Sequence, residues 1–261
     1  MRQVTAGLIC ALGILSMLPT GAVADYAGAL RAAESGERYE GAAEHPSDPW
    51  EAMNRRIFSF NETVDKYTAK PAAKTYRRVV PRFIRRSAGN FFENMRDLRS
   101  GVNNLLQWRW RDAGHNLGRF GLNTTLGVAG FFDVATSVEL TKRDSDFGIT
   151  LARWGVPEGP YLMLPGLGPS TVRDTPAMYP DYYLGPGRYI DHTVTGWTYT
   201  AVYLLDVRSR VLDYEDAISG DRYAFLRDFY LQGRRTAAGQ RSAEDDFEFG
   251  ADMDDWDDDD W

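Results

Sequence analysis

The side chains best suited to catalysis or metal binding are few in this sequence and lie far apart. The histidines are His45, His115 and His192, and none has a cysteine or a second histidine at the spacing that metal ligation requires. Each is therefore interpreted as an ordinary surface or core histidine. We expect no metal site and no cofactor.

Two glycine-containing motifs match known active-site signatures only in part. Residues 167–170, Leu-Gly-Pro-Ser, lack the second glycine of the G-x-S-x-G turn of hydrolases and have no obvious partner histidine. Residues 166–168, Gly-Leu-Gly, lack the third glycine of a dinucleotide-binding turn. Nearby aspartates could act as general acids, but capping and turn formation explain them more simply: Asp144, Asp146, Asp174 and Asp181. The sequence thus predicts no catalytic residues, and the protein is not expected to be an enzyme.

These motifs lie in a segment, residues 145–174, that is both apolar and rich in glycine and proline. Loops are normally polar because their backbone groups must meet water. A segment of this composition is therefore buried, lies against a membrane, or lines a site for an apolar ligand. The residues alone leave these three alternatives open.

The charge of the chain is unevenly distributed. The 261 residues carry a formal net charge of -7, yet eleven acidic residues and no Lys or Arg lie between residue 244 and the C-terminus. Outside this tail the basic residues outnumber the acidic ones. We expect a helical domain over residues 48–238 and a disordered acidic tail over residues 239–261.

The N-terminal residues 1–24 resemble a secretory signal peptide. Arg2 precedes an apolar run, residues 4–18, and Ala22-Val23-Ala24 fits a cleavage site. We expect cleavage there, export of the chain, and a tether over residues 25–47. Cys10 is the only cysteine, so no disulfide forms within the chain. Lipid attachment at Cys10 is an alternative, although the preceding residues 7–9 match the lipidation pattern poorly. A retained N-terminal anchor is another.

Apolar periodicity predicts several amphipathic helices. The first begins near Asp48, which is placed to cap it, and we expect its apolar stripe to face the core; contact with a partner is the alternative. A second is expected over residues 90–107 and a third over residues 112–126, whose glycines suggest close approach of another backbone. A last pair of helices is predicted over residues 197–212 and 221–235. Residues 175–190 are turn-rich. Strands have little support, except for a short extended piece at residues 161–164. The apolar stripe of the first helix comprises Trp50, Met53, Ile57, Phe60, Val64 and Tyr67.

A run of basic residues without any acid lies between residues 66 and 86. It fits either a solvated basic face or a patch for anionic lipid headgroups. Nucleic acid is not expected as a partner because the chain is exported. The candidate headgroup-facing or partner-facing patch comprises Lys74, Arg77, Arg78, Arg82, Arg85 and Arg86.

Several stretches, in this order along the chain, resemble the MlaA/VacJ family of outer-membrane lipoproteins, and they cover most of residues 48–235. The resemblance implies a mainly α fold: a ring-shaped amphipathic helical body embedded in the inner leaflet of the outer membrane, with a central channel and Gly/Pro-rich connecting segments. The stretches are DPWEAMNRRIFSFN (48–61), GVNNLLQ (101–107), RFGLNTTLGVAGFFDVA (119–135), DFGITLARWGVPEGPYLMLPGLGPSTVRD (146–174) and DRYAFLRDFYLQGRR (221–235).

The same resemblance implies a non-enzymatic role in phospholipid transport. Phospholipids mislocalised in the outer leaflet pass through the channel to a soluble periplasmic carrier, and the protein associates with a trimeric porin. Gly127 and Gly130 would form a flexible segment beside the channel. The residues expected to line the lipid path or contact the leaflet are Gly127, Gly130, Phe131, Phe132, Phe147, Trp154, Tyr161, Leu162, Leu164 and Leu167.

Two other functions remain as alternatives. One is a soluble periplasmic lipid-binding or structural protein without channel activity, which fractionation of cells would distinguish. The other is an exported hydrolase acting on lipids, which hydrolysis of a labelled phospholipid would reveal.

Overall fold

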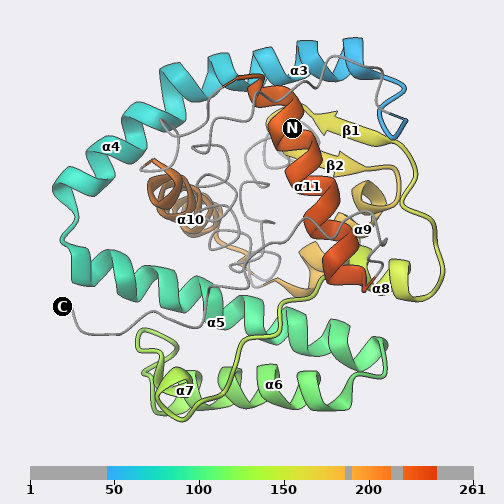
Figure 1. The fold of residues 1–261 in the computed structure, drawn as a ribbon. Coiled ribbons are helices and arrows are strands. Elements are labelled where there is room, and N and C mark those ends of the chain that lie inside the picture. The colour runs from blue at the N-terminus through green and yellow to red at the C-terminus, as the bar shows by residue number, and fades with distance from the viewer. Residues whose placement is uncertain (1–45, 186–189, 213–219, 240–261) are drawn as a thin grey trace.

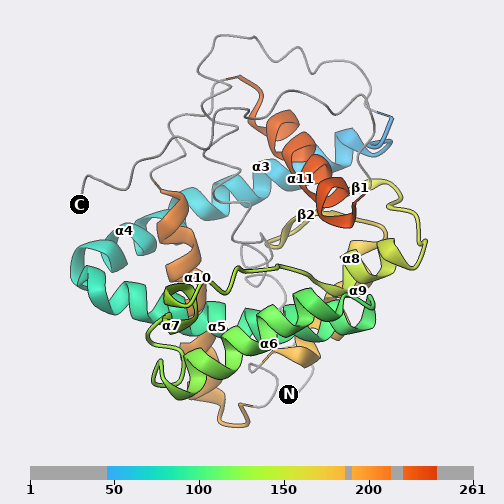
Figure 2. The same ribbon diagram turned by 60° about the horizontal axis from the view of Figure 1, so that its bottom comes forward.

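The computed structural model describes residues 46–185, 190–212 and 220–239, and this part of the chain is mainly helical (Figures 1 and 2). The predicted signal peptide, Cys10, and nearly all of the predicted tether and acidic tail lie outside these residues. In chain order the elements are α3 (Glu51–Val64), η1 (Asp65–Ala69), α4 (Lys70–Val79), α5 (Arg82–Leu106), α6 (Trp110–Thr125), α7 (Val134–Ser137), α8 (Phe147–Arg153), β1 (Tyr161–Leu164), β2 (Gly168–Thr171), α9 (Asp174–Leu184), α10 (Thr193–Val211) and α11 (Arg222–Ala238).

The helices α3 and α4 form one curved run along the edge of the molecule, joined by the π-helical turn η1 (Figure 1). The run ends at Val80, whose backbone is extended and which is followed by Pro81. The predicted cap at the start of α3 is wrong. Asp48 makes no capping bond, because its carboxylate accepts hydrogen bonds from Asn54 Nδ2 (2.7 Å) and from the Tyr223 hydroxyl.

The orientation predicted for α3 is also wrong. Its apolar stripe does not face the core: Phe60 is 56% exposed, Tyr67 is 71% exposed, and Trp50, Met53 and Val64 are exposed as well. The helix instead turns Asn54 inward, where the side chain is fully buried. These five members of the stripe point out of the molecule, and the sixth, Ile57, packs against the apolar core.

The strands β1 and β2 form an antiparallel hairpin in which Tyr161 faces Thr171 and Leu164 faces Gly168. The extended piece predicted at residues 161–164 is therefore confirmed, and β2 is its unpredicted partner. Two asparagines of α3 cover the other edge of β1. Asn54 donates to Tyr161 O (3.1 Å) and accepts from Met163 N (2.9 Å), while Asn61 donates to Leu164 O (3.0 Å) and accepts from Gly166 N (2.7 Å). Side-chain amides thus satisfy backbone groups that a third strand would otherwise pair with.

The helices α5 and α6 lie side by side as an antiparallel pair (Figures 1 and 2). The helix α5 begins at Arg82, before the predicted start near residue 90. A Cβ atom at Gly101 would lie 2.7 Å from Leu117 Cδ2, so this glycine of α5 permits close packing. The prediction that the glycines of α6 do so is wrong, because a Cβ at Gly114 or Gly121 would meet nothing within 4 Å.

The last three helices in chain order are α9, α10 and α11. The segment predicted as turn-rich contains α9, which continues through Pro180. The helix α10 begins earlier than predicted. Asp221 caps α11 by accepting hydrogen bonds from Tyr223 N (3.0 Å) and Ala224 N (3.3 Å), and Gly239 ends it in the left-handed conformation. Among the described helices, none combines the length and the apolar character needed to cross a bilayer.

Candidate functional site

Large apolar side chains are exposed along successive elements, from α3 to the turn after α6. We call this set the apolar rim. Phe83 is 71% exposed and Trp108 is 75% exposed. Exposing one such side chain to water forgoes about 1.5–3 kcal/mol relative to burial, and many exposed together mark a surface for a membrane or a partner. The rim comprises Trp50, Met53, Phe60, Val64, Tyr67, Val79, Phe83, Ile84, Trp108, Trp110, Leu126, Val128, Phe131 and Phe132.

The faces that α5 and α6 bury are polar. We call the buried side chains of these helices the polar core. Arg119 lies at its centre, where Nε donates to Asp97 Oδ2 (3.1 Å), Nη2 donates to Asp133 Oδ2 (3.0 Å) and Nη1 donates to Leu140 O (2.6 Å). One guanidinium therefore joins α5, α6 and the segment around α7. The polar core comprises Asn94, Asp97, Ser100, Asn103, Asn104, Gln107, Asn116, Arg119 and Asn123.

Burial and charge act in opposite directions on the two carboxylates that share Arg119. Burial raises the pKa of Asp97 to about 7, and the nearby Arg119 only partly offsets this rise. Burial would also raise the pKa of Asp133, but hydrogen bonds from Thr136, Asn123 and Arg119 lower it below its usual value. The cluster thus holds one carboxylate firmly charged and one that titrates near neutral pH.

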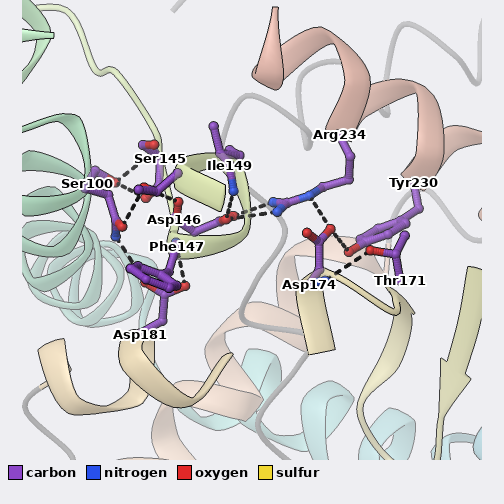
Figure 3. A network of polar contacts seen from close by, with 12 residues as sticks. Ser100, Ser145, Asp146, Phe147, Ile149, Thr171, Asp174, Asp181, Tyr230 and Arg234 are labelled. Atoms are coloured by element: carbon purple, nitrogen blue, oxygen red, sulfur yellow. Dashed lines mark hydrogen bonds and ion pairs between the residues drawn. The ribbon is translucent and has the colours of Figure 1, made fainter. Parts of the chain in front are cut away.

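A second buried network surrounds Arg234 of α11 (Figure 3). Its Nε donates to Asp174 Oδ2 (2.8 Å), and its two terminal nitrogens bond the carboxylate of Asp146. Asp174 also accepts from Tyr230 Oη (3.0 Å) and Arg173 Nε (2.8 Å). The network therefore ties α8, α9 and α11 together at both ends of the Gly/Pro-rich segment.

The geometry of this network depends on local backbone features. Asp146 caps α8 through Ile149 N (2.9 Å), and Arg234 lowers the pKa of Asp146 to about 2 despite burial. A Cβ at Gly148 would lie 2.5 Å from Asp174 Oδ1 and would also meet Arg234 Nη2, so only glycine leaves room for the ion pairs. On the α9 side, Asp181 accepts from Phe147 N (3.0 Å). Burial raises the pKa of Asp181 to about 6.

The Gly/Pro-rich segment is divided between core and surface. Four of its glycines have positive φ, as turns of this kind require: Gly155, Gly159, Gly166 and Gly168. Of the residues predicted to contact lipid, Tyr161 is buried in the apolar core and Trp154 is exposed, with its Nε1 donating to Leu106 O (3.1 Å). The remaining four are half-buried: Phe147, Leu162, Leu164 and Leu167. These six residues therefore do not form a single surface.

The segment around Gly127 and Gly130 is a tight, hydrogen-bonded turn. Gly130 has a φ of 88°, and a Cβ there would lie 2.8 Å from atoms of Asn94. A Cβ at Gly127 would lie 2.5 Å from Asn123 O, and Phe132 N bonds Gly127 O (2.9 Å). Both glycines are thus required for close packing against the polar core. The turn presents Phe131 and Phe132 to the outside.

The predicted basic patch is split by the structure. Arg77 and Arg85 are half-buried and donate to backbone carbonyls, at Ser209 O (3.5 Å) and Val80 O (3.2 Å). The other members are exposed, on α4 and the start of α5, next to apolar members of the rim: Lys74, Arg78, Arg82 and Arg86. Within the part of the chain that the structure describes, no group of three or more His, Cys, Asp or Glu side chains is placed to bind a metal.

A mainly helical body with a polar core and an exposed apolar rim is the arrangement of a protein that works where water meets an apolar phase. The chain belongs to the MlaA lipoprotein family, whose profile matches residues 46–237.

Individual relatives agree with this assignment. The chain is 34% identical over 194 residues to the intermembrane phospholipid transport system lipoprotein MlaA of Escherichia coli (strain K12), covering 71% of this chain and 76% of that protein. An uncharacterized protein of Rickettsia bellii (strain RML369-C) is 35% identical over 194 residues, covering 73% of this chain and 76% of that protein.

A solved structure described as "Structural basis for maintenance of bacterial outer membrane lipid asymmetry" is similar to this chain as well. It is 34% identical, with a TM-score of 0.65, and the match covers 74% of this chain and 99% of that one. The family named in the sequence analysis and the mainly helical fold are thereby confirmed.

Proposed function

We propose that the protein removes mislocalised phospholipids from the outer leaflet of the outer membrane and passes them to a periplasmic carrier. It acts as a ring-shaped helical body embedded in the inner leaflet, with a channel through the ring. It breaks no bond in the lipid. The mature chain lies on the periplasmic side of the outer membrane and associates with a trimeric porin.

The observation that carries this proposal is that the helices bury polar side chains and expose apolar ones. The apolar rim would cost free energy in water, but it gains from contact with acyl chains. Side chains of the polar core bond one another and the backbone, which satisfies many of the polar groups buried there. The relatives that are named for intermembrane phospholipid transport support the same role.

The turn at Gly127 and Gly130 is the proposed channel-side segment. It joins the polar core, through Asn94, to Phe131 and Phe132 of the rim. A phospholipid moving between leaflets needs both kinds of surface, since its headgroup is polar and its chains are not. The exposed basic residues of α4 and α5 would contact anionic headgroups at the edge of the leaflet.

The test measures outer-leaflet phosphatidylethanolamine in intact cells with an amine reagent that does not cross membranes. Deleting the gene should raise the labelling several-fold, and the wild-type chain should restore it. Replacing Gly130 with Val should prevent full restoration, because the new side chain strains the turn and meets Asn94. Replacing Gly121 with Ala, where nothing lies within 4 Å, is the matched control and should restore asymmetry.

Two outcomes would overturn the proposal. One is a deletion strain whose labelling equals that of the wild type. The other is recovery of the mature chain in the soluble periplasmic fraction, which would favour the lipid-binding or structural alternative. If the Gly130 variant fails to accumulate, Phe132→Ala tests the same turn at a side chain that is 60% exposed.

A further inference from the structure

Arg99 of α5 differs from the other described arginines whose side chains are partly or fully buried. Its Nε is buried, yet the side chain makes no hydrogen bond and no ion pair within the described part of the chain. The other described arginines that are not exposed all have such a partner, for example Asp97 for Arg119 and Asp65 for Arg208. A buried N–H group without a partner costs about 1–3 kcal/mol, and more when it is charged.

Arg99 lies on a face of α5 that points to other helices. Phe92, Arg96, Arg99 and Asn103 recur at steps of four, three and four residues, which places them on one side of the helix. At one end of this face Phe92 packs against Tyr199 of α10, with ring centroids 5.3 Å apart. At the other end Asn103 Nδ2 bonds Asp181 of α9 (3.1 Å).

The neighbouring carboxylates leave the guanidinium of Arg99 free to bond. Asp181 and Asp146 are close enough for Arg99 to lower their pKa values. Their hydrogen bonds are taken by other groups, however: Asp181 bonds Asn103 and Phe147 N, and Asp146 bonds Arg234 and Ile149 N. The two carboxylates therefore lie near Arg99 without occupying its donors.

The hydroxyl of Tyr199 is a second donor near Arg99. Burial raises the pKa of Tyr199 although the Arg99 guanidinium acts to lower it, so this hydroxyl keeps its proton and can donate it in a hydrogen bond. A guanidinium fork beside a hydroxyl matches the oxygens of a phosphate group, which accept two parallel N–H bonds and one O–H bond.

An aromatic track leads from these donors to the apolar rim. Tyr199 contacts Phe91 (ring centroids 6.5 Å apart), and Phe91 stacks on Phe131 at 6.1 Å. Phe131 is exposed at the turn that follows α6. The track is therefore aromatic from these donors to the surface proposed to contact acyl chains. Figure 2 shows α10 lying against α5, where Tyr199 and Arg99 respectively belong.

We propose that Arg99 and Tyr199 bind the phosphodiester group of a phospholipid while its acyl chains lie along Phe92, Phe91 and Phe131. The proposal rests on the proposed function and assigns residues to one step of it. The same donors would suit free phosphate, but only a phospholipid also uses the aromatic track.

The test uses the full chain in a non-ionic detergent and measures binding by isothermal titration calorimetry. The probes are a short-chain phosphatidylethanolamine, a diacylglycerol with the same chains, and inorganic phosphate. We expect the phospholipid to bind more tightly than either of the others. Arg99→Gln should weaken its binding at least tenfold, and Tyr199→Phe a few-fold. Arg111→Gln, which changes an exposed arginine of α6, should leave binding unchanged.

The outcomes separate the alternatives. Unchanged phospholipid binding by Arg99→Gln overturns the site. Inorganic phosphate that binds as tightly as the phospholipid identifies a free-phosphate site and overturns the lipid assignment. If Arg99→Gln does not fold, Tyr199→Phe gives the deciding measurement.

The labelling assay in cells distinguishes this site from the proposed function. Loss of binding together with full restoration of asymmetry by Arg99→Gln would remove the site from the path and leave the function standing. A deletion strain with normal asymmetry would remove the function, whatever the purified protein binds.

Discussion

Around the β1–β2 hairpin the buried side chains are apolar, whereas between α5 and α6 they are polar. Tyr161, Met163, Tyr223 and Leu231 form a small apolar cluster in the first region, each at most 2% exposed. In the second region the buried positions are held by asparagines and by the ion pairs of Arg119. The outer surface beside the polar core is apolar, and this rim continues over α3, which packs against the cluster.

The difference shows that the surroundings decide which face of a helix turns inward. Burial of apolar side chains stabilises a fold by removing them from water. Where acyl chains replace water outside, that advantage disappears, and hydrogen bonds and ion pairs inside must hold the helices together. The apolar cluster is stabilised by burial from water, and a polar core beneath an apolar rim suits a surface that contacts acyl chains.

The largest expected effect comes from breaking the polar core. Arg119→Ala leaves Asp97 and Asp133 without their shared cation, and removing one partner of a buried ion pair costs about 3–5 kcal/mol. Urea unfolding in a non-ionic detergent should show this loss in the free energy of unfolding. Arg111→Ala, at an exposed position of the same helix, should change it by less than about 0.5 kcal/mol. A loss below about 1 kcal/mol for Arg119→Ala would mean that the polar core does not hold the helices together.

The sequence predicted the first strand of the hairpin but not which face of α3 turns inward. The extended piece expected at residues 161–164 is β1 in the structure. The apolar stripe of α3 was also recognised, but periodicity reports only that a stripe exists. It contains no information about the solvent outside, so the stripe was assigned to the core.

A signal for the polar core was present in the sequence. Asn94, Asp97, Gly101 and Asn104 recur at steps of three, four and three residues, and Asn116, Arg119 and Asn123 do the same on the next helix. A polar stripe with helical spacing opposite an apolar one fits a helix that buries its polar face equally as well as a helix that buries its apolar face. The partners of Arg119 and Arg234 come from several elements, so no local pattern could have identified these networks.

The same chemical change should have different consequences in the two regions. Leu231→Ala opens a cavity in the apolar cluster and should lower the free energy of unfolding by about 2–4 kcal/mol. Leu126→Ala removes a side chain that is 66% exposed and should change it by less than about 0.5 kcal/mol. Binding to lipid vesicles should show the reverse order, with only Leu126→Ala weakening it. Equal losses of stability would contradict the distinction between cluster and rim.

The pH dependence of two buried carboxylates should have opposite signs. The pKa of Asp146, lowered to about 2 by Arg234, adds stability that is complete above about pH 4 and is lost as the pH falls toward 2. This contribution is on the order of 2 kcal/mol, at about 1.4 kcal/mol per pKa unit. The pKa of Asp97, raised by burial to about 7, adds stability that is complete below about pH 4 and is lost as the pH rises to 7.

Unfolding measured from pH 3 to pH 8 for the wild type, Asp146→Asn and Asp97→Asn separates the two contributions. The difference between the wild type and Asp146→Asn should shrink only at the acid end. The Asp97→Asn variant should lack the fall in stability that the wild type shows between pH 4 and pH 7. The same acid-side dependence for both carboxylates would mean that Arg119 holds Asp97 fully charged. The polar core would then match the Arg234 network in its electrostatics and differ from it only in the rim outside.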